Sequence, residues 1–198
     1  MLRCLHSNRA AMTTTTVTRP QPRTRRWTYA DYCRIPADRF RHEIIDGRHF
    51  VTLSPSTNHQ AVSIRLGYES MRLIEKKALG RVFTAPLDVH LGRGTVVQPD
   101  LVVILGRNHA IIGDKKVTGV PDLLIEILSP STKRRDRKKK FARYERAGVR
   151  EYWIVDPEAH VVEQYFLRSG KYGAPTVSGK RVRLRILRGI EIDLREVW

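Results

Sequence analysis

The stretch Pro121-Asp-Leu-Leu-Ile-Glu-Ile-Leu-Ser-Pro-Ser-Thr132 decides the fold of this 198-residue chain. Its first part predicts a buried strand from Asp122 to Leu128, and its Ser- and Pro-rich end predicts a turn. One residue interrupts the apolar run. Glu126 lies among Leu and Ile residues, where an ionised carboxylate is costly unless a cation or a strong hydrogen-bond donor lies beside it. The strand therefore predicts a partner for Glu126 elsewhere in the chain.

A helix rich in Lys and Arg is predicted directly after this turn, over residues 133–147, with Gly148 ending it. A second apolar strand, Glu151–Asp156, follows. Segment 133–140 carries seven basic residues and a single acid, which makes it the most strongly charged part of the chain. A buried acid next to such a helix indicates a site for a divalent metal ion and a phosphate group.

Helical spacing places Asp136, Lys140 and Tyr144 along one face of this helix, and we expect that face to point inward. The other basic residues are expected to point mostly outward, where they would contact the phosphates of a nucleic acid. They are Arg134, Arg135, Arg137, Lys138 and Lys139.

The rest of the chain predicts an α/β (α+β) fold in which helices flank a mixed β-sheet, with extra strands at both ends. A polar surface loop is expected over 106–120. The expected helices are 27–34 and 54–78, the expected hairpin is 41–53 with an Asp46-Gly47 turn, and the expected strands are 81–91, 96–105, 122–128, 151–156, 160–167, 181–187 and 190–194.

The formal net charge of +17 makes a polyanionic partner the first possibility to consider. Residues 1–26 contribute six Arg and no acid, and they lack periodicity, so we predict a disordered basic tail ahead of a single domain over 27–198. A transit peptide and an over-extended start, with Met12 as the true first residue, are alternatives to a native tail beginning at Met1. Two cysteines and no apolar run of about 20 residues predict a cytoplasmic protein without a membrane span.

Asp100 and Glu126 are the candidate metal ligands. Pro99 fixes the entry to the strand that Asp100 begins, and Glu126 lies near the end of the next core strand. If the two strands are antiparallel neighbours, the start of one lies beside the end of the other, and the two carboxylates meet. Hard oxygen ligands suit Mg²⁺ or Mn²⁺. Lys140 is the basic residue best placed to reach them.

Several motifs together resemble the Uma-two family of restriction-endonuclease-like proteins, within the PD-(D/E)XK nuclease superfamily. They are Tyr29-Ala-Asp-Tyr32, His42-Glu-Ile-Ile-Asp-Gly47, Pro99-Asp100, Pro121 to Thr132, Asp136, Lys140, Tyr144 and Gly148 to Pro157. The resemblance implies a helix-strand-strand-strand-helix-strand nuclease core and metal-dependent hydrolysis of phosphodiester bonds, with Asp100 as the first acid of the motif and Glu126 as the second.

One residue departs from the superfamily pattern. The superfamily places a Lys two residues after the second acid, where this chain has Leu128. A Lys that has moved to the following helix is a known variation in such folds, and Lys140 would take that role. The sequence thus predicts a Mg²⁺- or Mn²⁺-dependent endonuclease acting on DNA. The alternative is a catalytically impaired nuclease fold that binds nucleic acid, and a structural or oligomer-forming protein is a third class.

Three further residues are candidate auxiliary groups. Glu43 matches an acid in the opening of the family, His59 lies at a predicted helix start, and Asp136 precedes Lys140 by one helical turn. Each has an ordinary alternative: a solvated hairpin residue, a capping or surface residue, and an ion-pair partner of Lys140, respectively. Exposed edge strands make a homodimer a further expectation.

Overall fold

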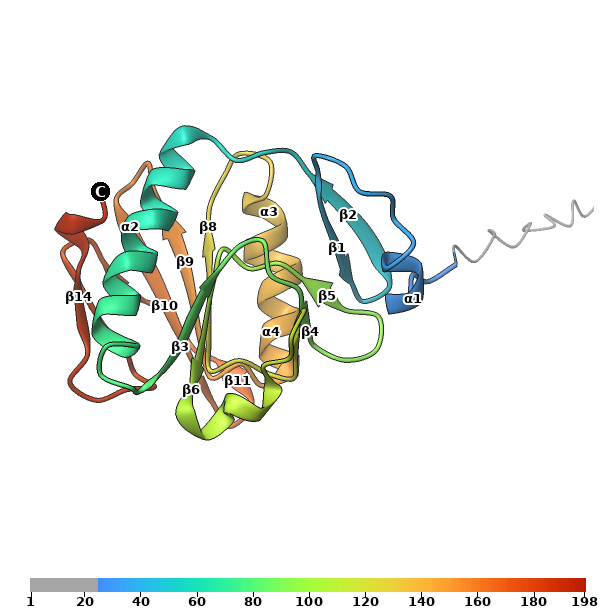
Figure 1. Cartoon of the computed structure of the whole chain (residues 1–198). Coiled ribbons are helices and arrows are strands. Elements are labelled where there is room, and N and C mark those ends of the chain that lie inside the picture. The colour runs from blue at the N-terminus through green and yellow to red at the C-terminus, as the bar shows by residue number, and fades with distance from the viewer. Residues whose placement is uncertain (1–24) are drawn as a thin grey trace, which may run out of the picture.

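The computed structural model describes residues 25–198, and its elements form layers (Figure 1). A large mixed sheet lies in the centre, with the long helix α2 (Thr57–Ile74) on one face. The helix over 133–147 covers the other face, and a smaller sheet lies beyond it. The part of the chain predicted as a disordered tail falls almost wholly outside the described residues. Within residues 25–198, no helix has the length and apolar character needed to cross a membrane.

The large sheet has the strand order β11-β10-β9-β8-β6-β3, with β12 paired to β10. Only β8 and β9 are parallel to each other, and the helix over 133–147 connects them, as a parallel pair requires. The predicted core order of helix, three strands, helix and strand is confirmed. The strands are β3 (Gly80–Thr84), β6 (Leu101–Leu105), β8 (Leu123–Ile127), β9 (Glu151–Asp156), β10 (Val161–Arg168), β11 (Lys171–Tyr172) and β12 (Thr176–Ser178).

The small sheet has the order β2-β1-β5-β4-β7. The predicted hairpin forms its edge, since β1 and β2 are antiparallel and the Asp46-Gly47 turn joins them. The other strands have only two residues each. The bounds are β1 (Arg41–Ile45), β2 (Arg48–Thr52), β4 (Val89–His90), β5 (Val96–Val97) and β7 (Val117–Thr118).

Two strands that the sequence predicts as continuous, 81–91 and 96–105, are each divided between the two sheets. The first leaves the large sheet after β3 and enters the small one at β4, while the second passes from β5 to β6. Both crossings contain a proline, Pro86 and Pro99, which has no N–H to donate to a sheet ladder. The second crossing ends at Asp100, so this residue lies where the two sheets part.

Alternate residues of β8 face two different cores. Leu123, Ile125 and Ile127 pack with α2. Leu124 packs in the other core, which includes Tyr144 of the helix over 133–147. Glu126 shares the face of Leu124 because side chains alternate along a strand. Its carboxylate therefore points towards the basic helix, inside the protein.

The helix over 133–147 is continuous, but it is not a regular α-helix throughout. Between α3 (Lys133–Arg135) and α4 (Phe141–Ala147), the segment Asp136–Lys140 forms a widened π-helical turn. Gly148 ends the helix with φ 87°, a left-handed conformation that glycine adopts without strain. Widened turns of this kind are frequent at functional sites, and here the turn carries the acid and the lysine that face inward.

Two expected elements near the ends of the chain are shorter than the sequence predicts, and the expected loop over 106–120 contains regular structure. The helix expected over 27–34 is α1 (Tyr29–Tyr32), capped by Thr28. The loop over 106–120 contains a 3₁₀ helix, Gly106–Ile111, as well as β7. The strand expected over 181–187 is reduced to β13 (Arg181–Arg183), which pairs with β14 (Glu191–Asp193), and a 3₁₀ helix, Leu194–Glu196, follows.

Candidate active site

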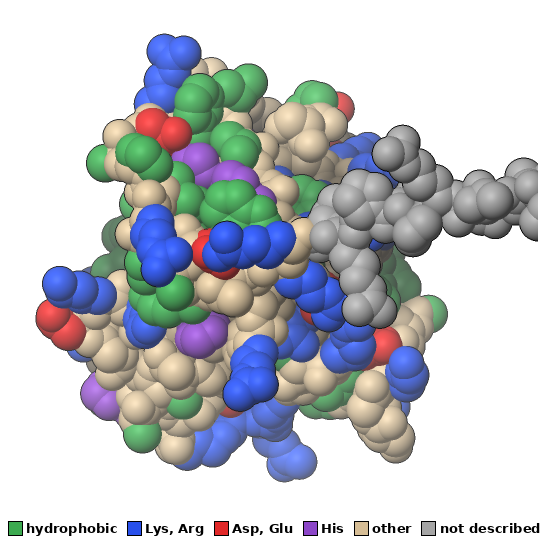
Figure 2. All heavy atoms as spheres, turned by 90° about the vertical axis from the view of Figure 1, so that its right-hand side faces the viewer, with side chains coloured by type: hydrophobic (Ala, Val, Ile, Leu, Met, Phe, Trp, Pro, Cys, Tyr) green, Lys and Arg blue, Asp and Glu red, His purple; other side chains and the backbone are tan. Residues whose placement is uncertain are grey.

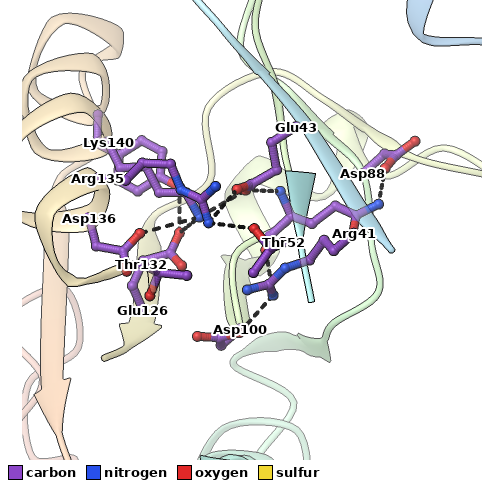
Figure 3. A network of polar contacts seen from close by, with 12 residues as sticks. Arg41, Glu43, Thr52, Asp88, Asp100, Glu126, Thr132, Arg135, Asp136 and Lys140 are labelled. Carbon is purple, nitrogen blue, oxygen red and sulfur yellow. Dashed lines mark hydrogen bonds and ion pairs between the residues drawn. The ribbon is translucent and has the colours of Figure 1, made fainter. Parts of the chain in front are cut away.

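The structure brings Glu126, Lys140 and Tyr144 into direct contact. Figure 3 shows Lys140 and Glu126 pointing towards each other from the helix and from β8. The Lys140 ammonium lies 2.8 Å from Glu126 Oε1, and the Tyr144 hydroxyl donates a hydrogen bond of 2.6 Å to the same oxygen. Tyr144 is fully buried, so it packs in the core as expected and also donates to the acid. The partner that Glu126 requires comes from the helix that follows its own strand.

Lys140 is surrounded by acids. Its ammonium lies 2.8 Å from oxygens of both Glu43 and Glu126, and 3.8 Å from Asp136. Burial disfavours the charged form of this fully buried lysine, but the attraction of the three carboxylates outweighs it and raises the pKa of the ammonium. Lys140 is therefore a fixed positive charge and not a proton acceptor.

Glu43 is a buried member of this cluster, not a solvated hairpin residue. Besides Lys140, it accepts a hydrogen bond of 2.9 Å from the backbone N–H of Gln98. Arg135 lies 3.4 Å away and also donates to Thr52. Burial would raise the pKa of Glu43, yet Lys140, Arg135 and Arg41 together lower it, so this acid is ionised.

The inward position of Arg135 corrects the expectation that it points to solvent. Its side chain is only 10 % exposed, and it reaches across to the strands of the small sheet. The helix over 133–147 lies between the large sheet and the β1–β2 hairpin (Figure 1), so a side chain that points away from the sheet can meet the hairpin.

Asp100 lies beside Glu126 at the same end of the large sheet, as the antiparallel pairing predicts. In this pairing Leu101 lies opposite Ile125. Asp100, which precedes Leu101, is therefore next to Glu126, which follows Ile125. The Asp100 carboxylate accepts hydrogen bonds of 2.8 Å from Arg41 and from the backbone N–H of Ile127, and it lies 3.2 Å from His59 Nε2. Although burial favours the neutral acid, His59 and Arg41 hold the pKa of Asp100 well below its usual range.

Glu126 and Asp136 lie where a negative charge is not fully compensated, so each holds its proton more tightly than an ordinary carboxylic acid does. Burial, and then repulsion from Asp136, Asp100 and Glu43, raises the pKa of Glu126 to about 8 in spite of Lys140. Burial likewise raises the pKa of Asp136. One oxygen of Asp136 and one of Glu43 are buried without a hydrogen-bond partner. The cluster thus has more carboxylate oxygens than its cations and donors satisfy.

A hollow of about 430 Å³ leads to Asp100. It is lined by the start of β1, the start of α2 and the segment around Pro86, and both Arg41 and His59 lie in its wall. Figure 2 shows the side of the molecule that carries the small sheet, with more Lys and Arg than Asp and Glu side chains on its surface. This hollow gives Asp100 a route to solvent although its side chain is only 3 % exposed.

The basic residues of the helix over 133–147 do not act as one surface. Arg134, Lys138 and Lys139 are exposed, as expected for residues that would contact phosphates. Arg137, also expected to point outward, is only half-exposed and donates two hydrogen bonds of 2.7 Å to Glu163. Arg135 and Arg137, two of the five residues predicted to contact phosphates, are therefore engaged in contacts within the protein.

The donor set fits a hard divalent ion, although it supplies few ligands. Within residues 25–198, no three His, Cys, Asp or Glu side chains lie together in a way that could hold a metal ion by themselves. Mg²⁺ keeps several waters and is often bound by only one or two carboxylates, so Asp100 and Glu126 suffice in number. A dication would also replace the proton that Glu126 retains up to a pH of about 8.

Arg41 is the residue of this site that the sequence analysis did not single out. Its guanidinium donates a hydrogen bond to Asp100, and its side chain lines the hollow. The signal was present, because Arg41 precedes Glu43 by two residues on the same strand and side chains two apart share a face. Recognising it requires knowing that the Glu43 face of β1 points inward, which the hairpin pattern alone does not say.

A family model described as "Putative restriction endonuclease" matches residues 29–195. The chain belongs to the Uma2 family. A crystal structure of a "putative nuclease" from Anabaena variabilis superposes with a TM-score of 0.72 at 18% sequence identity, covering 86% of this chain and 97% of the other. The chain therefore has a nuclease-like fold. No curated protein matches the sequence.

Membership of the Uma2 family and the nuclease-like fold agree with the resemblance seen in the sequence motifs. The description of the family implies an interaction with nucleic acid, and the +17 charge suits such a partner. The catalytic, metal-binding and phosphate-binding roles of individual residues, the cytoplasmic location and the homodimer stay predictions.

Proposed function

We propose that this Uma2 protein is a Mg²⁺- or Mn²⁺-dependent endonuclease of the PD-(D/E)XK type that hydrolyses phosphodiester bonds in DNA. The convergence of Asp100, Glu126 and Lys140 at one end of the central sheet, next to a hollow open to solvent, carries this proposal. These three residues come from two adjacent strands and a helix, as a two-acid and one-lysine hydrolytic site requires.

Asp100 and Glu126 would hold the ion. When bound, it supplies a Lewis acid that draws electron density from the phosphodiester group. Asp100 is fixed for this task by Arg41, His59 and the Ile127 N–H, so its carboxylate keeps one orientation. Glu126 would give up its proton to the solvent as the ion binds.

Lys140 would stabilise the negative charge that develops on the phosphate oxygens during attack by water. The raised pKa of its ammonium supports this role over that of a general base, because a base must release its proton near the working pH. Tyr144 and Glu43 would hold Lys140 and Glu126 in place through their hydrogen bonds. The exposed Arg134, Lys138 and Lys139 would contact flanking phosphates, which gives affinity without sequence specificity.

The test is cleavage of plasmid DNA by the purified protein in Mn²⁺, in Mg²⁺ and in EDTA. We expect nicking in either metal, none in EDTA, and none with Glu126→Gln, which keeps the shape of the side chain. Glu163→Gln is the matched control, because Glu163 pairs with Arg137 away from the site. Equal cleavage by the Glu126→Gln variant would refute the proposal.

A nucleic-acid-binding protein without hydrolytic activity is the second candidate. Leu128, at the usual position of the lysine, is 5 % exposed and packs in the core, so this position cannot contribute a charge to the site. Lys140 is also held between two carboxylates at 2.8 Å. Binding of DNA that persists in EDTA, with no cleavage in either metal, would favour this candidate.

A further inference from the structure

Three hollows lie in a row along the segment between α1 and β1. The first, of about 500 Å³, is bordered by Trp27 and His49; the last is the hollow at Asp100. A middle one of about 440 Å³ shares Ile35 and Pro36 with the first and Phe40 and Gln98 with the last. Because neighbouring hollows share wall residues, the row leads from Trp27 to the candidate active site.

Trp27 is fixed in the wall of the first hollow. Its backbone N–H donates to Gly47 O at 2.9 Å, and its indole stacks on His49 with ring centroids 4.3 Å apart. The residue is nevertheless only half-buried. An aromatic ring held in this way presents a stacking surface that loses little conformational entropy on binding.

Phe40 stands where the middle and last hollows meet, and it is also half-buried. The Arg39 guanidinium lies 5.4 Å from the centre of its ring. Tyr29, by contrast, is occupied within the protein, since it stacks on His90 and has the Lys116 ammonium 3.7 Å from its ring centre. Tyr32, in the wall of the middle hollow, is likewise held by hydrogen bonds between its hydroxyl and Asp88 and Gln98. This leaves Trp27 at the start of the row and Phe40 near its end as the rings offered for stacking.

Arginines flank both rings. Arg25 and Arg34 border the first hollow, where their side chains are 78% and 75% exposed and share the single acid Asp31. Arg39 and Arg41 border the last, together with Asp38 and Asp100, and the middle hollow has Lys115 beside Asp38 and Asp88. Acids and cations are thus nearly balanced along the row, and the exposed arginines are concentrated at its first hollow. Exposed arginines beside half-buried aromatic rings are an arrangement by which proteins bind single-stranded nucleic acid, whose unpaired bases are free to stack. The bases of a duplex are already stacked on each other and leave such rings unused.

We propose that this row of hollows binds an unpaired nucleic-acid strand, with Trp27 and Phe40 stacking on its bases and the arginines contacting its phosphates, and leads it to Asp100. The destination of the strand rests on the proposed hydrolytic function, but its binding does not. The substrate of the site would then be a single strand or the unpaired part of a larger nucleic acid.

The experiment measures binding in EDTA, so that cleavage plays no part. The probe is a labelled oligonucleotide of twelve thymidines, followed by fluorescence anisotropy and compared with its duplex with oligo(dA). We expect tighter binding of the single strand. Trp27→Ala should raise the Kd about tenfold, equal to about 1.4 kcal/mol, which lies in the range of one base stack.

Trp198→Ala is the matched control. Trp198 is also half-buried and stacks on a histidine, His160, but it lies at the opposite end of the molecule from α1 (Figure 1). We expect this variant to change the Kd less than twofold. Phe40→Ala should weaken binding of the single strand as Trp27→Ala does, which keeps the test decisive if one variant folds poorly by circular dichroism.

Tryptophan fluorescence gives a second readout. Of the tryptophans in the described part of the chain, Trp153 is 0 % exposed and Trp198 is remote, so quenching by the oligonucleotide must come from Trp27. We expect quenching in the wild type and none in Trp27→Phe. No binding of the single strand, tighter binding of the duplex, or binding that is equally strong in the Trp27→Ala and Trp198→Ala variants would overturn the proposal.

The outcomes separate this inference from the proposed function. Quenching and single-strand binding in EDTA, with no cleavage of either the single strand or plasmid DNA in Mn²⁺, would uphold the row of hollows and refute hydrolysis. Cleavage that depends on Glu126, together with single-strand binding in EDTA that does not depend on Trp27 or Phe40, would uphold hydrolysis and refute the row.

Discussion

The ammonium of Lys140 lies 2.8 Å from Glu126 Oε1, although the two residues belong to different elements and are 14 positions apart. Lys140 thus supplies beside Glu126 the positive charge that Leu128, at the usual position of the lysine, cannot supply. The contact also holds both side chains in place inside the protein. Because neither residue is more than 1 % exposed, the contact affects stability as well as any chemistry at the site.

Replacing Lys140 with Met should destabilise the protein by about 3 to 5 kcal/mol, because it leaves the ionised Glu43 buried without the Lys140 ammonium and removes a hydrogen-bond donor from Glu126. Urea unfolding measures this loss. Lys138→Met is the control, since Lys138 is exposed on the same helix, and it should change the free energy of unfolding by less than about 0.5 kcal/mol. Equal stability of the two variants would mean that Lys140 is not required by the acids.

Glu126 should make stability fall as the pH rises. Its pKa is raised from 4.5 to about 8, so the folded protein binds its proton more tightly than the unfolded chain does. The resulting stabilisation is complete below pH 4.5 and is lost as the pH increases to about 8. Unfolding in urea at several pH values should show a shallower decline in Glu126→Gln than in the wild type. Parallel curves for the two proteins would contradict the raised pKa.

The ion pair of Arg137 with Glu163 should have the opposite pH dependence. A side-chain hydrogen bond from Arg137 lowers the pKa of Glu163, so this pair stabilises the protein above the ordinary glutamate range and is lost as the pH falls through the lowered value. Removing it with Glu163→Gln should therefore cost stability at pH 7 but not at acid pH. The partial exposure of both side chains limits the loss to about 1 kcal/mol.

Binding of Mn²⁺ should release a proton from Glu126. Calorimetric titrations in two buffers of different ionisation enthalpy would count the protons released, and we expect close to one at pH 7. Affinity should fall about tenfold for each pH unit below 8. Asp100→Asn should abolish binding, and Glu163→Gln should leave it unchanged. Binding without proton release would mean that the ion is held elsewhere.

Affinity for DNA should depend on salt through the exposed face of the basic helix. Replacing Arg134, Lys138 and Lys139 with Gln should reduce the slope of log Kd against log salt by about 0.7 to 0.9 for each phosphate that the variant no longer neutralises. Arg137→Gln should change the slope less, because Arg137 already bonds to Glu163. An unchanged slope in the triple variant would mean that the phosphates bind away from this helix.

The core of the fold could be predicted from the sequence because its signals are local. The apolar run around Glu126, the turn after it and Gly148 fix β8, the helix and β9 in order. β6 and β8 are antiparallel neighbours, so the start of one lies beside the end of the other and Asp100 meets Glu126. This proximity could be predicted from the antiparallel pairing alone. Pro99 indicated where a strand starts, but the division of two strands between two sheets at Pro86 and Pro99 was not foreseen.

The surroundings of the site could not be predicted in the same way. Whether Arg135 points outward depends on the β1–β2 hairpin lying over the helix, and this packing joins segments 83 positions apart. The same applies to Arg41 and His59, which meet Asp100 from the small sheet and from α2. A helical projection assigns an inner and an outer face, but it cannot show that a second layer covers the outer one.

The sequence by itself determined the order of the core elements, the two acids on adjacent strands and the lysine on the inner face of the next helix. These follow from hydrophobic periodicity and from strand and turn geometry, which act over a few residues. Only the tertiary structure decided which charges are buried together: Glu43, Glu126 and Asp136 around Lys140, and Asp100 between Arg41 and His59. The physical reason is that the charge state of a buried group depends on every neighbour that packing brings near it, whatever the distance along the chain.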